Sequence, residues 1–181
     1  MEFLNKVFWE WVLPLTSLLF LVLVGKDLAF AFLARYLANS GTARNWIVKQ
    51  ARKRPDRKIV HLGSLYMERF WLVPLVMGFG IRLHIIHRPD ASQDHHNHPG
   101  SFRTLILWGG YHEETDDGIF MWGAGDTYKV NRRHFHRIER LTSKGPTITL
   151  CILYRWGRTR WGFRLPDGSV VDHRDYIGYD K

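Results

Sequence analysis

The sequence predicts an all-β barrel that is preceded by apolar helices. From Ile59 onward, short runs of aliphatic and aromatic residues alternate with Gly, Pro and Asp turns. Turn signals at roughly 8–12 residue spacing are typical of sandwiches and barrels. Before Ile59 the chain holds a long uncharged stretch and then a dense group of basic residues. We therefore expect an N-terminal helical and membrane-anchor segment over residues 1–58, the barrel over 59–177 and a tail over 178–181.

The predicted strands are bounded by these turns. Asp117-Gly118 is a hairpin signal, and Pro166-Asp167-Gly168 marks another turn. No long helical period interrupts this half of the chain, which favours an all-β domain. We expect strands over Ile59–Gly63, Tyr66–Val73, Gly80–His87, Ser101–Trp108, Tyr111–Glu114, Ile119–Trp122, Thr127–Val130, His134–Leu141, Thr147–Tyr154, Trp161–Leu165 and Val170–His173.

An uncharged stretch covers Trp11–Gly25. A helix needs about 20 residues to cross a bilayer, and the range Val7–Gly25 reaches this length with Glu10 at the interface. Lys6 precedes the stretch, whereas Lys26 and many further bases follow it. By the positive-inside rule, we expect Val7–Gly25 to span a membrane, with the barrel on the cytoplasmic side.

A helical hairpin is the rival interpretation of the N-terminal segment. Pro14 and the pair Lys26-Asp27 interrupt the apolar pattern. A second apolar helix over Leu28–Ala38 would then pair with the first or lie in the membrane interface. Without membrane attachment the chain would be cytoplasmic. The start of the chain lacks the basic region of a signal peptide, which argues against cleavage.

The formal net charge of +9 is concentrated in residues 44–58, where seven basic residues face one acid, Asp56. We expect a basic helix that begins near Thr42 and ends before Pro55. Its basic face is either simply solvated or attracted to anionic lipid headgroups. Nucleic acid is disfavoured as a partner, because no stacking platform or recognition motif accompanies the charge.

Several classes of enzyme find no support in the sequence. The single cysteine, Cys151, excludes an intramolecular disulfide, and its apolar surroundings indicate a buried, inert thiol. No serine-hydrolase triad order, P-loop or dinucleotide-binding glycine motif is present. Hydrolase, nucleotidase and dehydrogenase functions are therefore disfavoured.

Two pairs of histidines are the candidate metal ligands of the sequence. His96 and His98 lie two residues apart, and His134-Phe135-His136 repeats this spacing. Alternate side chains of a strand share a face, so two such strands can point three imidazoles into a barrel. Neutral imidazole is a common ligand of Zn, Fe, Ni and Cu ions. We expect His96, His98 and His136 to bind one divalent metal, with His134 or His95 as residues that join or replace one of them.

These segments resemble the two sequence motifs of the cupin superfamily. His96-Asn97-His98 matches the His-x-His core of the first motif, with Gly110 at its closing glycine. Gly125 and His136 match the second motif in their spacing. The resemblance covers roughly residues 59–177. It implies a small jelly-roll type barrel with a metal site, in a superfamily that includes dioxygenases, isomerases, epimerases and sensors.

The departures from the motifs narrow the metal chemistry. The glutamate of the first motif is replaced by Phe102 or Arg103, depending on the spacing. A three-His site, as in thiol dioxygenases, is then the closer match, with Fe(II) expected first and Zn, Mn or Ni as alternatives. Asn131, Arg133 and Arg140 depart from the second motif and leave the choice between His136 and His134 open.

These residues predict a non-haem Fe(II) dioxygenase-like enzyme. Arg103, pointing inward, would make the pocket cationic and suited to a small anionic substrate; pointing outward, it would be solvated. Arg103 and Tyr111 are the candidate catalytic residues. The alternatives are a non-catalytic ligand-binding or sensing cupin tethered to the membrane, and a cupin isomerase or epimerase. The interpretation also allows a homodimer.

Overall fold

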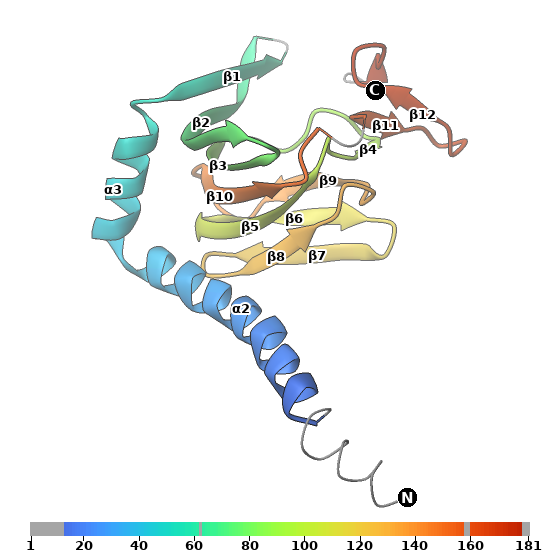
Figure 1. Ribbon diagram of the computed structural model, residues 1–181. Coiled ribbons are helices and arrows are strands. Elements are labelled where there is room, and N and C mark those ends of the chain that lie inside the picture. Colours follow the sequence, from blue (N-terminus) through green and yellow to red (C-terminus); the bar gives the residue numbers. More distant parts are fainter. Residues whose placement is uncertain (1–12, 62, 158–159, 179–181) are drawn as a thin grey trace, which may run out of the picture. The chain divides into compact units, whose positions relative to one another are not determined.

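The computed structural model describes residues 13–61, 63–157 and 160–178, with side chains described from Gly25 onward (Figure 1). The chain forms two compact units, Met1–Leu33 and Ala34–Lys181. The second unit contains the strands and the predicted site. It is therefore the part of the molecule that bears on function.

Two helices lead into the strands. Helix α2 covers Leu13–Asn39 without interruption, and α3 covers Gly41–Ala51. The hairpin with a break at Lys26-Asp27 is therefore wrong, because the helix continues through these residues. Ser40 caps α3 by accepting a hydrogen bond from the Ala43 amide (3.2 Å).

The predicted membrane span, Val7–Gly25, lies almost entirely outside the residues whose side chains are described. Within the described part of the chain, no helix combines the length and the apolar character that crossing a membrane requires.

The strands form two six-stranded sheets. The order in the first is β1-β2-β3-β10-β5-β8, and in the second β12-β11-β4-β9-β6-β7. Their bounds are β1 Pro55–His61, β2 Ser64–Val76, β3 Phe79–Ile86, β4 His95–His96, β5 Ser101–Trp108, β6 Gly110–Thr115, β7 Gly118–Gly123, β8 Thr127–Val130, β9 His136–Leu141, β10 Thr147–Tyr154, β11 Gly162–Arg164 and β12 Val170–Asp172. The predicted strands at β5, β8 and β10 are confirmed residue for residue.

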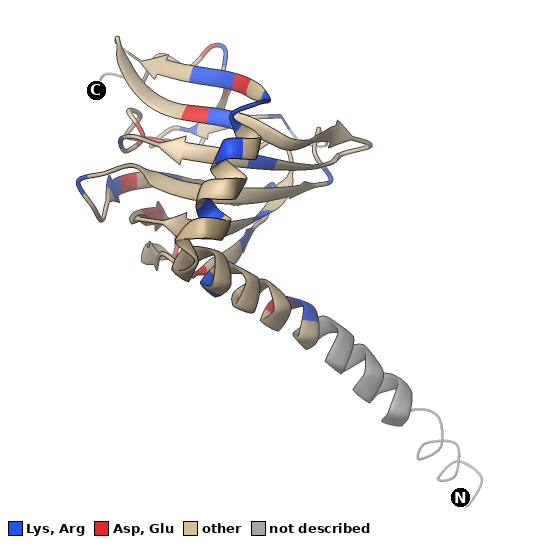
Figure 2. Cartoon of the chain, turned by 90° about the vertical axis from the view of Figure 1, so that its left-hand side faces the viewer, with Lys and Arg blue, Asp and Glu red and all other residues tan. Residues whose placement is uncertain are grey.

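The basic stretch is divided among three elements. Helix α3 ends at Ala51, a turn follows over 52–54, and β1 already begins at Pro55. The single basic helix up to Pro55 is therefore only partly correct. Pro55 is tolerated at the start of β1 because this strand lies at the edge of the sheet. Figure 2 shows basic residues both on α3 and on the strands next to it.

The first sheet has two different faces. Helix α3 packs against β2 and β3, and the fully buried Leu83 and Leu105 alternate with the residues that line the cavity. On the inner face, a core of Ile86, Ile106, Tyr111 and Ile138 joins the two sheets. Three of these residues, Ile86, Tyr111 and Ile138, also line a cavity between the sheets.

Candidate metal centre

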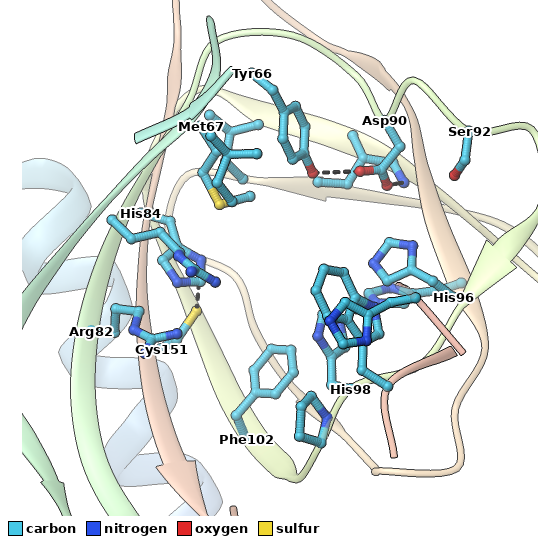
Figure 3. A pocket seen from close by; sticks show the side chains of 18 of the residues that line it. Tyr66, Met67, Arg82, His84, Asp90, Ser92, His96, His98, Phe102 and Cys151 are labelled. Carbon is cyan, nitrogen blue, oxygen red and sulfur yellow. Dashed lines mark hydrogen bonds between the residues drawn. The ribbon is translucent and has the colours of Figure 1, made fainter. Parts of the chain in front are cut away.

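A cavity of about 710 Å³ lies between the two sheets. Its size falls in the usual range of small-molecule sites, roughly 300–1,000 Å³. Its lining includes the predicted ligands His96, His98 and His136, the basic residues Arg69, Arg82 and His84, and the apolar residues Met67, Phe102 and Leu153 (Figure 3).

The structure brings the three predicted ligands together. His96 on β4 is paired with His136 on β9, so adjacent strands hold their rings side by side. The ring centroids of the three histidines lie 5.0–5.1 Å apart, and Nε2 of His98 lies 2.8 Å from Nε2 of His136. One ligand atom from each ring lies within 4.8 Å of the others.

The expected strand geometry is wrong for His98. Strand β4 ends at His96, and His98 lies in the following loop. Asn97, buried between them, accepts a hydrogen bond from the Gly162 amide (2.8 Å) and donates one to the Arg132 carbonyl (3.4 Å). These contacts fix the loop from both sides. His98 is therefore directed into the cavity by an anchored loop and not by strand periodicity.

Glu113 on β6 orients His136. Its Oε1 is hydrogen-bonded to Nδ1 of His136, and its Oε2 accepts a hydrogen bond from the Trp122 indole (2.7 Å). Burial alone would raise the pKa of Glu113, but the interactions with His134 and His136 outweigh burial and lower it to about 2. An ionised carboxylate only accepts hydrogen bonds. In the neutral ring of His136, Nδ1 therefore carries the proton and Nε2 presents its lone pair to the cavity.

Burial holds the other two imidazoles, those of His96 and His98, in the neutral form. Burial lowers the pKa of His96 to about 4, against the opposing effect of Asp90. Burial, reinforced by His136, lowers the pKa of His98 well below its ordinary value. Neutral imidazole is the form that binds metals, so burial favours the ligand state of His96 and His98 over their cationic state.

The donor set fits a divalent metal. Nitrogen ligands at about 2.0–2.1 Å from an ion lie roughly 3.0–3.4 Å apart, close to the spacing of the His98 and His136 nitrogens. Nδ1 of His96 is buried without a hydrogen-bond partner among the described residues. Three imidazoles at this spacing, one of them supported by a carboxylate, match the ligand arrangement of metal sites with open coordination positions.

His95 and His134 do not join this cluster. Nδ1 of His95 lies 3.5 Å from Asp116, because His95 faces the other side of β4 from His96. His134 precedes β9 and lies 3.8 Å from Oε1 of Glu113. Glu113, His134 and His136 form a second possible group of metal ligands. Of these three, only His136 lines the cavity.

The two predicted catalytic residues lie in different places. Tyr111 lines the cavity and shares a hydrogen bond of 2.6 Å with the hydroxyl of Tyr128. Arg103 does not line the cavity, although its neighbours Phe102 and Thr104 do. It is buried on the other face of β5, where it donates a hydrogen bond to Thr127 (3.3 Å). Of the two orientations left open for Arg103, the inward one is not adopted, because strand alternation assigns that face to its neighbours, and the outward side chain is buried instead of solvated.

Sequence reasoning missed Glu113 and the arginines of the cavity wall. Because side chains alternate along β6, Tyr111 and Glu113 share a buried face. This alternation could have indicated from the sequence that Glu113 lies near the site. Arg82 and His84 likewise alternate with aliphatic residues in β3. A charged residue at every second position of such a strand can indicate a polar interior.

Comparisons with known proteins agree with this architecture. No protein-family model and no curated protein sequence matches the chain. Among solved structures, the DMSP lyase DddQ from Ruegeria pomeroyi DSS-3 matches with a TM-score of 0.54 at 14% identity, over 72% of this chain and 71% of that chain. FeII HppE gives a TM-score of 0.48 at 14% identity, over 56% of this chain and 57% of that chain. Pac13, a nucleoside dehydratase, gives a TM-score of 0.43 at 12% identity, over 56% of this chain and 77% of that chain.

The match to HppE spans a little over half of the HppE chain. DddQ, which matches over more than two thirds of both chains, is a cupin-fold protein. The arrangement of the two sheets around the histidine cluster therefore has the cupin fold that the histidine motifs predict.

Proposed function

We propose that this chain is a metal-dependent cupin enzyme in which His96, His98 and His136 hold one divalent ion, with Fe(II) as the expected metal. We further propose that it is a non-haem dioxygenase-like enzyme for a small anionic molecule. The observation that carries the proposal is the cluster of three imidazoles on the wall of a cavity of about 710 Å³.

Three neutral ligands leave a bound divalent ion its full charge, so it supplies Lewis-acid strength and, as iron, redox capacity. Glu113 holds His136 in the tautomer that presents Nε2. Phe102 and Phe163 pack on His98 and His96 and exclude water from that side of the cluster. Burial raises the pKa of Tyr111 well above its ordinary value, so its hydroxyl keeps its proton and remains a neutral hydrogen-bonding group of the cavity wall.

The test combines metal analysis with oxygen consumption. Purified full-length protein is loaded anaerobically with Fe(II) and screened against small organic anions. Stoichiometric iron and oxygen uptake that depends on the anion support the proposal, and both must be lost in His96→Ala. Conversion of a substrate without oxygen uptake would point to an isomerase or epimerase. Binding without conversion would point to a sensing protein.

We also propose that residues 7–25 attach the chain to a membrane, with the barrel on the cytoplasmic side. The uncharged stretch Trp11–Gly25 supports this, as do exposed apolar side chains later in α2, with Phe32 65% and Tyr36 62% exposed. Retention in the membrane fraction after carbonate washing is the expected result. Release by salt alone would indicate a peripheral contact through the basic residues, and solubility without detergent would indicate a cytoplasmic protein.

A further inference from the structure

The wall of the cavity that faces the histidine cluster is basic. Arg69 on β2 is paired with His84 on β3, and the next inward position of β3 is Arg82. All three line the cavity. Figure 3 shows Arg82 and His84 on one side of the cavity and His96 and His98 on the other. Two separate sets of polar groups, one basic and one suited to a metal, therefore line opposite walls.

The charge of this basic wall is incompletely balanced. Oδ2 of Asp56 lies 3.6 Å from Nε of Arg69 and 3.3 Å from Nη2 of Arg82, so two guanidinium groups share one carboxylate. Nε of each arginine is buried without a hydrogen-bond partner among the described residues. A buried guanidinium group that lacks a full set of partners is costly, which favours binding of an anion from solution.

The surroundings of Arg82 keep its guanidinium group in place. Arg82 is 7% exposed and stacks over the ring of Trp71 at 4.0 Å. Burial lowers its pKa to about 10, which still leaves it charged at neutral pH. Such a fixed planar cation suits a planar anion that accepts two hydrogen bonds. Arg82, which is fixed in position on the cavity wall, is therefore preorganised to bind a carboxylate.

The charge on this one wall favours a monoanion. The guanidinium groups of Arg69 and Arg82 against the carboxylate of Asp56 leave one unit of positive charge on the wall, which one carboxylate neutralises. Arg57 also lines the cavity, but it is exposed and its charge is screened by solvent. Between the basic wall and the histidines, Phe102 and Leu153 contribute apolar surface. The cavity thus provides a basic end, an apolar middle and an end suited to a metal.

We propose that Arg69 and Arg82 bind the carboxylate of a small organic acid whose apolar body lies along Phe102 and Leu153. This carboxylate site names the substrate class of the proposed function. It rests on that function in one respect, namely that the far end of the acid reaches the metal centre. The carboxylate site itself does not depend on a metal, so the two proposals can be tested separately.

The experiment is calorimetric titration of metal-free, full-length protein with acetate, benzoate and octanoate. Octanamide serves as the uncharged counterpart of octanoate, and inorganic phosphate as the alternative anion. We expect octanoate or benzoate to bind and octanamide to bind at least about tenfold more weakly. Arg69→Gln and Arg82→Gln should each weaken binding of the carboxylate roughly 10- to 100-fold. Arg82→Lys should be intermediate, because it keeps the charge but loses the paired donors.

Lys144→Gln, which removes one positive charge from the exposed β9–β10 turn, is the matched control and should leave the affinity unchanged. Circular dichroism verifies that each variant is folded. If Arg82→Gln does not fold, Arg82→Lys takes its place in the test. Failure of all three carboxylates to bind, preferential binding of phosphate, or equal affinity in the arginine variants would overturn the proposal. His96→Ala should retain carboxylate binding, so loss of metal in that variant tests the proposed function alone.

Discussion

Glu113 on β6 and His136 on β9 form a buried hydrogen bond in which Nδ1 of the imidazole is the donor. The bond lies between adjacent antiparallel strands, and it turns Nε2 of His136 toward the other two histidines. A carboxylate behind a metal-ligating histidine fixes both the tautomer and the orientation of the ring. The state of Glu113 therefore influences the metal affinity of the whole cluster.

Replacing this carboxylate should weaken metal binding without removing a ligand. In Glu113→Gln the side chain still accepts a hydrogen bond but loses its charge, and metal affinity should fall roughly 10- to 100-fold. Titration with Zn²⁺ or Co²⁺ measures this. Glu114→Gln is the matched control, because Glu114 lies on the opposite face of β6 and pairs with Arg137. Equal affinities in the two variants would contradict the role assigned to Glu113.

Removing any one ligand should abolish stoichiometric metal. Purified His96→Ala, His98→Ala and His136→Ala should each contain little metal by elemental analysis, and each should remain folded. His95→Ala and His134→Ala should keep a full complement. If His134→Ala loses the metal while His98→Ala keeps it, the ion is instead held by the group of Glu113, His134 and His136.

The metal-free protein should lose stability as the pH falls below neutrality. Burial lowers the pKa of His84 and His98 well below the ordinary value and that of His96 to about 4. The unfolded chain protonates these groups near pH 6.5, so below that pH it binds protons that the folded chain does not. The free energy of unfolding should therefore be highest above about pH 6.5 and fall by up to about 1.4 kcal/mol per pH unit for each histidine.

Guanidinium denaturation between pH 7 and pH 4 measures this slope. His84→Gln should make the slope shallower, because it removes one of the three groups. His87→Gln, which removes an exposed histidine, is the matched control, and the slope should remain steeper in this variant than in His84→Gln. A midpoint that does not change over this range would show that the buried histidines are not held neutral.

The anchor between the first two ligands should matter for both stability and metal. Asn97→Ala leaves the Gly162 amide without its acceptor, at a cost of about 1–3 kcal/mol in the free energy of unfolding. It should also weaken metal binding, because the loop that carries His98 is released. Asn131→Ala, at an exposed turn, should change stability by no more than about 0.5 kcal/mol. Thermal and denaturant unfolding of both variants provide the comparison.

Arg103 should affect stability but not recognition of a carboxylate. Its side chain is buried away from the cavity and contacts Thr127, so Arg103→Gln should lower the unfolding midpoint. Calorimetry with octanoate should give the wild-type affinity for this variant. A loss of affinity comparable to that of Arg82→Gln would show that Arg103 reaches the bound acid after all.

Much of the architecture followed from local patterns. Strands β5, β8 and β10 were predictable because apolar and β-branched residues alternate between clear turn signals. The start of β1 at Pro55 was not, because a helix-breaking proline also suits the first position of an edge strand. Likewise, Lys26-Asp27 looks like an interruption in the sequence, yet a helix accommodates both residues without a break.

For the candidate site, too, the sequence predicted one part, and tertiary contacts decided the rest. The sequence by itself determined which imidazoles are available, and the spacing of the two pairs predicted a cluster of His96 and His98 with His136 or His134. Only the tertiary structure decided how His98 is directed, since its loop is held by contacts to β11 and to the turn before β9. It also decided that Arg69 and Arg82, rather than Arg103, line the cavity. The inward face of a strand depends on its pairing partners and on bulges, which lie far away in the sequence.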